Sequence, residues 1–94
     1  MKVKISKSTK KGKKYMALFT DKKIKKTIHF GADGFSDFTI HRDNQRKERY
    51  LKRHRKRENW NNPMTAGSLS RYILWNKTSL KESIKDYKKR FSLS

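Results

Sequence analysis

The chain has 94 residues, 32% of them apolar and 37% charged, and its 27 Lys and Arg against 8 Asp and Glu give a formal net charge of +19. This length suffices for one small domain with a modest core, and so many like charges repel one another unless a partner neutralises them. The absence of cysteine excludes disulfides and thiolate metal sites. No apolar run is long enough for a membrane span or a secretion signal, so we expect an intracellular or intravirion protein.

The first 14 residues carry seven lysines, with Ser, Thr and Gly between them. Val3 and Ile5 alternate with lysines, which is typical of a short edge strand. Beyond Ser6 the composition is that of a flexible cationic segment, so we predict a basic Lys-rich arm over residues 1–14. A disordered solubilising tail is the alternative interpretation.

Residues 15–30 contain the clearest strand pattern. Tyr15–Thr20 and Lys23–Phe30 are rich in aromatic and β-branched residues, and residues 20–23 between them predict a tight turn. The segment therefore predicts a β-hairpin. Because two strands alone are marginally stable in water, this hairpin must pack on a helix, a third strand or a partner.

A glycine-containing loop, Gly31–Gly34, ends the predicted hairpin, and we expect Phe35 and Phe38 to anchor the residues that follow. Asp33 and Asp37 lie four residues apart in this loop but lack the further acidic ligands of a calcium-binding EF-hand. We interpret them as turn residues whose carboxylates accept hydrogen bonds from nearby backbone.

The stretch RDNQRKERYLKRHRKR, which begins at Arg42, contains nine Lys and Arg among sixteen residues. Its residue types predict a basic helix over residues 43–57, with Asp43 as the N-cap. Its only candidates for an apolar stripe are Tyr50, Leu51 and His54. Such a helix buries a narrow edge and presents a cationic surface around most of its circumference.

The C-terminal third predicts a helical hairpin over residues 65–91, after a turn at residues 59–63. Thr65 is the expected N-cap of a helix to about Trp75, and Ser79 with Glu82 forms the capping box of the next helix. One apolar stripe runs along that last helix through Leu80, Ile84, Tyr87 and Phe91. Together the elements predict an α+β fold: an N-terminal β-hairpin, with a third edge strand as a possibility, then the basic helix and the helical hairpin, in one small domain over residues 15–94.

No pattern for catalysis or cofactor binding is present. His29, His41 and His54 do not have the spacing of a metal site, and the glycines form no phosphate-binding loop. We therefore expect no enzyme activity, no metal and no cofactor. A charged domain of this size also seldom encloses the pocket that a nucleophile and its base require.

The cationic residues of the arm and of the basic helix are the candidate anion-binding site. Arm and helix together suit contacts with phosphates, which position a protein on nucleic acid without reading its sequence. A carboxylate on an acidic protein surface is an equally good candidate for the anion, since arginine pairs with phosphates and carboxylates alike. The candidates are Lys10, Lys11, Lys13, Lys14, Arg42, Arg46, Lys47, Arg49, Lys52, Arg53, Arg55, Lys56 and Arg57.

The two tryptophans are assigned different roles. The position of Trp75 in the helical pattern predicts a core residue. Trp60 lies in a turn rich in asparagine, where it either plugs the junction between the basic helix and the next helix or anchors a partner.

Residues 31–91 carry three distinctive segments, GFSDFTIHRD, ERYLKRHRKRENWNNPMTAG and ILWNKTSL. This stretch resembles a family of short basic proteins encoded by large nucleocytoplasmic DNA viruses, of the kind that infect algae and amoebae. The resemblance implies a viral origin and a place in the virion or the replication factory. It implies no catalytic activity, cofactor or functional residue.

From these features we expect a non-enzymatic virion structural protein, a minor capsid or core-lining component that docks on acidic capsid proteins or packaged DNA. In the host cell it would occupy the virus factory, in the cytoplasm or nucleus. The alternative is a non-specific nucleic-acid-binding protein for DNA condensation, transcription or replication. Salt-sensitive duplex binding distinguishes the alternative from tight binding to a capsid protein.

Overall fold

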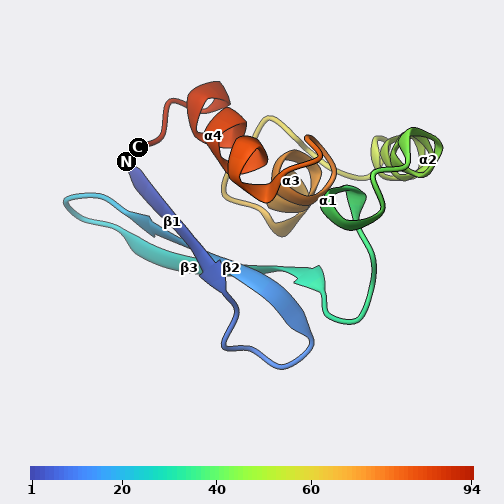
Figure 1. Cartoon of the computed structure of the whole chain (residues 1–94). Helices are drawn as coiled ribbons and strands as arrows, with labels where there is room; N and C mark the ends of the chain where they lie inside the picture. Colours follow the sequence, from blue (N-terminus) through green and yellow to red (C-terminus); the bar gives the residue numbers. More distant parts are fainter.

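The computed structural model describes all residues from 1 to 94 and confirms the α+β fold. Three antiparallel strands, β1 (Lys2–Lys7), β2 (Lys13–Thr20) and β3 (Lys25–Ala32), form a sheet in the order β1-β2-β3 (Figure 1). The predicted hairpin is thus β2 and β3, and the possible edge strand is β1. The central strand pairs on both sides, so the sheet has the three strands that stability in water requires.

The prediction of a flexible arm over residues 1–14 is wrong. All of β1 pairs with β2, and a tight turn joins them, in which the Lys13 amide donates to the Lys10 carbonyl at 3.2 Å. The two chain ends are also joined, because the Val3 amide donates to the Ser94 carbonyl at 2.9 Å (Figure 1). The physical reason is the alternation of the strand: Val3 lies in the core while the lysines beside it point to solvent.

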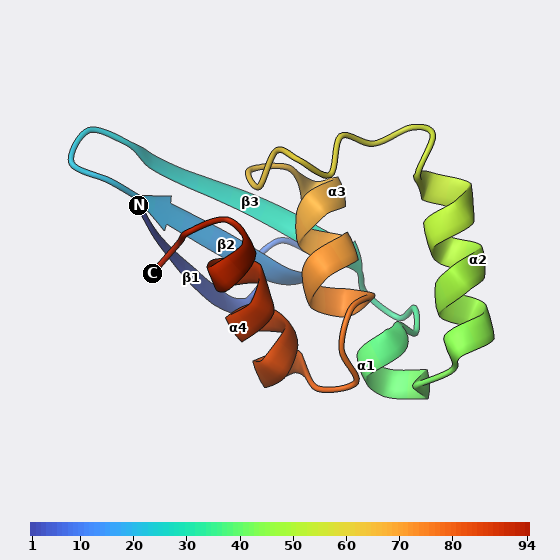
Figure 2. The ribbon, with the colours of Figure 1, turned by 90° about the horizontal axis from the view of Figure 1, so that it is seen from above.

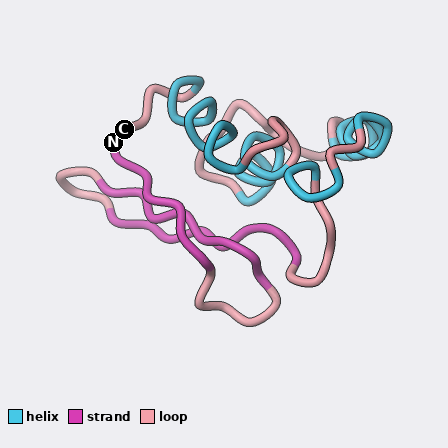
Figure 3. Tube along the Cα trace, in the orientation of Figure 1, coloured by secondary structure: helices cyan, strands magenta, loops and turns pink.

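Five helical segments follow the sheet. They are α1 (Phe38–His41), α2 (Asn44–His54), α3 (Ala66–Leu69), the π-helix η1 (Ser70–Leu74) and α4 (Leu80–Arg90). The helices lie over one face of the sheet, and the opposite face carries none (Figures 1 and 3). The layering follows from the sheet, because its buried apolar residues Val3, Ala17, Phe19 and Phe30 all point to the same side.

The core lies between that face of the sheet and the C-terminal helices. The strand register brings Val3 opposite Phe19 and Tyr15 opposite Phe30, so the aromatic residues of adjacent strands share one face. Eight buried apolar residues form the cluster: Val3, Ala17, Phe19, Phe30, Leu69, Ile73, Leu74 and Tyr87. The Tyr87 hydroxyl donates to the Pro63 carbonyl at 2.6 Å, which satisfies the one polar group among these side chains.

The single helix expected from Thr65 to Trp75 is instead a short α-helix that widens into η1. Thr65 is the N-cap as predicted and accepts a hydrogen bond from the Ser68 amide at 3.1 Å. The chain then widens by one residue, so that the Trp75 amide donates to the Ser70 carbonyl at 3.0 Å. With this wider turn, Ile73 and Leu74 are both buried, which regular helical spacing would not favour.

Of the two expected loop anchors, only one is buried. Phe38 is 4% exposed, whereas Phe35 is 72% exposed, so the expectation that Phe35 anchors the loop is wrong. The difference arises because α1 turns Phe38 inward, while Phe35 remains in the loop between β3 and α1. Seen from above, α2 stands at the edge of the molecule, beside the body formed by the sheet and the C-terminal helices (Figure 2).

Candidate polyanion-binding site

The basic helix begins as predicted and ends earlier. The Asp43 carboxylate accepts hydrogen bonds from the amides of Gln45 at 2.9 Å and Arg46 at 3.4 Å, which satisfies donors that the first turn leaves unpaired. The helix ends at His54, not at residue 57. The chain then turns, with the Arg57 amide donating to the His54 carbonyl at 3.0 Å, so the last three basic residues lie on a turn.

One narrow face of α2 packs on the body through stacked aromatic rings. Tyr50, the only buried residue of the helix, lies parallel to Trp75 with ring centres 4.2 Å apart. His54 stacks on Tyr50 at the same separation, and its Nδ1 lies 3.3 Å from the carboxylate of Glu58. Burial, with a further contribution from Glu58, raises the pKa of Tyr50 to about 12. The stripe expected from sequence is therefore the surface by which α2 is attached.

Two of the predicted anion-binding lysines are used inside the structure. Lys47 donates to the Asn76 carbonyl at 2.7 Å, and its ammonium lies 4.7 Å from the centre of the Phe38 ring. Burial, reinforced by nearby cations, lowers the pKa of Lys47. Lys14 forms an ion pair with Asp37 at 2.6 Å, and both side chains are largely buried. Both ammonium groups thus make contacts within the chain, and the charge of Lys14 is neutralised by Asp37.

The other candidates are exposed. Arg42 lies between α1 and α2, and α2 and the turn after it carry Arg46, Arg49, Lys52, Arg53, Arg55, Lys56 and Arg57. At the other site Lys10 and Lys11 lie in the β1–β2 turn and Lys13 at the start of β2. None of them is in an ion pair, since the only ion pairs are Lys14–Asp37, His54–Glu58 and Arg90–Asp86. Only two of the 27 Lys and Arg side chains therefore have an acidic partner in the chain.

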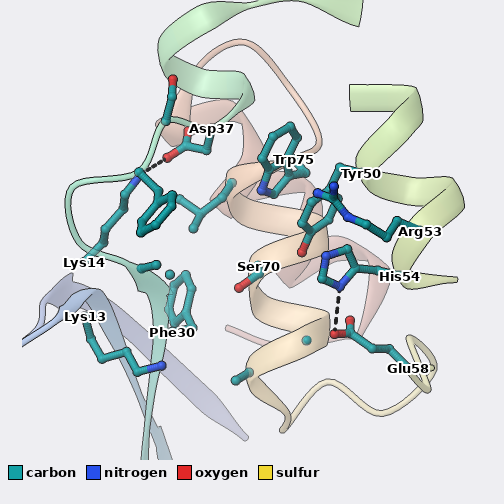
Figure 4. A pocket seen from close by; sticks show the side chains of 17 residues that line it. Lys13, Lys14, Phe30, Asp37, Tyr50, Arg53, His54, Glu58, Ser70 and Trp75 are labelled. Atoms are coloured by element: carbon teal, nitrogen blue, oxygen red, sulfur yellow. Dashed lines mark hydrogen bonds and ion pairs between the residues drawn. The ribbon is translucent and has the colours of Figure 1, made fainter. Parts of the chain in front are cut away.

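The two cationic regions meet across a cleft. Lys13, from the start of β2, and Arg53, from α2, line the same hollow between the sheet and the helix (Figure 4). The exposed cations of the β1–β2 turn and those of α2 thus border one hollow, and together we call them the positive region. Such a region attracts a polyanion and lets the counterions on it be released.

Trp60 is engaged within the chain. Its indole Nε1 donates to Glu58 at 2.9 Å, and the guanidinium of Arg71 lies 5.5 Å from its ring centre. Since the side chain is half-buried, Trp60 fits the interpretation as a plug of the junction between α2 and α3. Its role as a partner anchor stays a prediction.

Arg71 was missed by the sequence reasoning. Its Nη1 donates to the Trp75 carbonyl at 2.9 Å, and its guanidinium lies 5.0 Å from the Tyr72 ring centre. Burial lowers its pKa from the usual arginine value, with the nearby arginines acting in the same direction. The only signal in the sequence is its isolation as a single charge within the apolar stretch around η1.

No group of three His, Cys, Asp or Glu side chains lies close enough to hold a metal ion. No helix combines the length and the apolar character needed to cross a membrane.

A family model matches residues 3–54, from β1 to the last residue of α2. This span includes the lysine-rich N-terminus, the sheet and the basic helix. No curated protein and no solved structure matches the chain. Because the matched segment covers more than half of the 94 residues, the chain belongs to the family of unknown function DUF5754.

Proposed function

We propose that this protein is a non-enzymatic, nucleic-acid-binding structural component that docks on phosphates through the exposed face of α2 and the β1–β2 turn. The observation that carries the proposal is the set of unpaired cations on a helix that buries only one residue. A helix kept only for packing would have a wider apolar stripe. The composition of α2 instead matches a surface selected for its charge.

The net charge supports a phosphate partner. Neighbouring cations on α2 repel one another, since only Asp43 and Glu48 oppose them between residues 42 and 57. A nucleic acid removes this repulsion and releases its own condensed counterions, which contributes favourable entropy. The contacts position the protein without specifying a base sequence, because every nucleotide presents the same phosphate.

The setting we propose is the particle of a large DNA virus, on the strength of the resemblance of residues 31–91. There the positive region faces packaged DNA, and acidic capsid surfaces are the competing docking partner. Finding the protein in infected cells but never in purified particles, by quantitative mass spectrometry, would rule out this setting. That result would leave the proposed phosphate binding to be judged by the binding experiment below.

The binding experiment is a salt titration of a fluorescently labelled DNA duplex, followed by anisotropy. The test variant replaces Arg46, Arg49 and Lys52 by Gln; all three are exposed and unpaired. We expect weaker binding and a slope of log affinity against log salt that is shallower by up to roughly 2.7, since each lost phosphate contact contributes about 0.9.

The matched control replaces Lys22, Lys23 and Lys25 by Gln. These residues are exposed at the opposite end of the sheet, around the β2–β3 turn, and their loss changes the net charge equally. The control should bind nearly as the parent does. Equal weakening in both variants would show that only total charge matters and would overturn the assignment to α2. Tight binding of an acidic capsid protein, with weak binding of the duplex at low salt, would select the protein partner instead.

A further inference from the structure

A cleft of about 420 Å³ separates α2 from the body (Figure 4). One wall comes from Tyr50 and Arg53 of α2 and from Trp75, the residue after η1. The other comes from the start of β2 and the loop after β3. Its volume lies within the range of about 300–1,000 Å³ that is typical of small-ligand sites. The cleft is therefore large enough for one nucleotide but too small for a base-paired helix.

The cleft offers aromatic surface at its wall and at its rim. The stack of Tyr50 on Trp75 lines the wall, and Phe35 lines the rim with 72% of its surface exposed. The position of Phe35 is fixed by a turn in which Gly34 has a φ of 85° and the Phe35 amide donates to the Ala32 carbonyl at 3.3 Å. An aromatic side chain held outward on an ordered turn is suited to stack on a partner.

The loop that presents Phe35 is also tied to the cationic β1–β2 turn. The Asp33 amide donates to the Gly12 carbonyl at 2.9 Å. At the base of the loop, Gly31 has a φ of 80°, and a Cβ there would lie 2.8 Å from Leu74 Cδ1. Glycine is thus required for β3 to approach η1 this closely. The loop at the rim is thus joined to both the β1–β2 turn and the body.

The charge of the cleft favours an anion. Lys13 and Arg53 lie on opposite sides, and neither has an acidic partner. The lining also holds two acids: Asp37 is neutralised by its ion pair with Lys14 at 2.6 Å, whereas Glu58 accepts a hydrogen bond from the neutral Trp60 indole at 2.9 Å and keeps its negative charge, so it opposes one of the two unpaired cations. The free charge in the cleft is therefore positive.

We infer that this cleft receives one unpaired nucleotide of a single-stranded nucleic acid. The base stacks on Phe35 and enters beside the Tyr50–Trp75 wall, while the flanking phosphates lie near Lys13 and Arg53. Proteins that bind single strands combine aromatic platforms with a cationic groove in this way. The inference rests on the proposed phosphate binding and adds a preference for single strands over duplex.

The experiment compares a single-stranded oligonucleotide with a duplex of equal length, using the whole chain. A 2-aminopurine placed in the single strand reports stacking, because its fluorescence falls when it stacks on an aromatic ring. We expect Phe35→Ala to weaken single-strand binding by roughly 5- to 150-fold, the range for losing one base–aromatic stack, and to abolish the fluorescence change. Duplex affinity should stay as in the parent.

Two controls isolate the cleft from general hydrophobicity and charge. Ile40 is 64% exposed and lines a neighbouring groove but not this cleft, so Ile40→Ala should leave the fluorescence change intact. Arg53→Gln should weaken single-strand binding more than Arg49→Gln, which removes an exposed charge that does not line the cleft.

The outcomes separate this inference from the proposed function. Equal affinity for single strand and duplex, with no effect of Phe35→Ala on the 2-aminopurine signal, would overturn the cleft while leaving phosphate binding by α2 in place. If the triple α2 variant binds duplex as tightly as the parent, the proposed function itself fails, whatever Phe35→Ala does.

Discussion

The body and the helix α2 differ in how much apolar surface they bury and in how many of their charges are paired. The body buries eight apolar side chains between the sheet and the C-terminal helices, and its ion pairs and hydrogen bonds are internal. The helix α2 has eleven residues, buries one of them, and carries cations without acidic partners over the rest of its surface. One region supplies most of the folding free energy, and the other adds like charge to the surface.

The difference indicates that the body stabilises the fold, whereas α2 is held in place by contacts with the body. Burial of apolar area is the main favourable contribution to folding, so a helix with one buried side chain depends on its neighbours to stay in place. For α2 these neighbours are Trp75, which stacks on Tyr50, and Asn76, whose carbonyl accepts from Lys47. Changes in the body should therefore unfold the whole chain, whereas changes beneath α2 should release that helix alone.

The largest expected effect is in the body. Phe19→Ala removes a side chain that is fully buried, and should lower the free energy of unfolding by about 3–5 kcal/mol, the usual cost of deleting a core aromatic. Urea denaturation followed by circular dichroism measures it. Phe35→Ala is the matched control, because that phenylalanine is 72% exposed and should change stability little. Similar losses in the two variants would contradict the location of the core.

A smaller and local effect is expected from Tyr50→Ala. Burying an aromatic side chain contributes about 1.5–3 kcal/mol, and here most of the loss should appear as separation of α2 from the body. Hydrogen exchange measured by NMR should show faster exchange of the α2 amides, with the amides of β2 still protected. Equal acceleration in β2 and α2 would show that α2 and the body unfold together.

The elements that the sequence predicted correctly are those that depend on residues close together in the chain. The hairpin of residues 15–30, the N-caps Asp43, Thr65 and Ser79, and the narrow stripe of α2 are all present. Each depends on residues close together in the chain, and the physical rules for caps and periodicity act over that range.

The predictions that failed depend on contacts between distant residues. The first 14 residues resemble an arm by composition, and their pairing with β2 depends on the burial of Val3 in a core that also contains Tyr87. The pairing of Lys14 with Asp37 and the bond from Lys47 to the Asn76 carbonyl cross 23 and 29 positions. The pattern of charges in a sequence gives the number of cations but does not show which of them form contacts within the folded chain. For the same reason the sequence did not predict the cleft, whose lining residues come from distant parts of the chain.

The N-cap of α2 offers a still smaller test. Asp43→Ala removes the acceptor for the first-turn amides and a negative charge near the positive end of the helix dipole, and should cost about 0.5–2 kcal/mol. Because the cap belongs to α2, the loss should accelerate exchange there more than in the sheet. Asp43→Asn retains the capping oxygen and should recover most of the stability. If Asp43→Asn lowers the stability as much as Asp43→Ala does, the effect comes from the lost charge and not from the lost hydrogen bonds.

The smallest expected effect is a pH dependence that begins at the same helix end. His41 Nδ1 accepts from the Asp43 amide at 2.9 Å, which requires a neutral ring with its proton on Nε2, and Nε2 is buried without a hydrogen-bond partner. Burial first, and then the charge of Arg46, lowers the pKa of His41 from its ordinary 6.5, while Asp43 and Asp37 oppose the shift.

A lowered pKa in the folded state means that the unfolded chain binds the proton first as the pH falls. The stability from neutral His41 is therefore complete above about pH 6.5 and is lost as the pH falls from there through the lower folded pKa. Urea denaturation at about pH 7.5 and about pH 5 should show a loss that is smaller in His41→Asn, whose amide oxygen can accept from Asp43 without titrating. Since every other titratable group is present in both proteins, an identical loss in parent and variant would assign the pH dependence to groups other than His41. A loss specific to His41 would instead show that protonation loosens the beginning of α2, the end of the helix from which the exposed cations are presented.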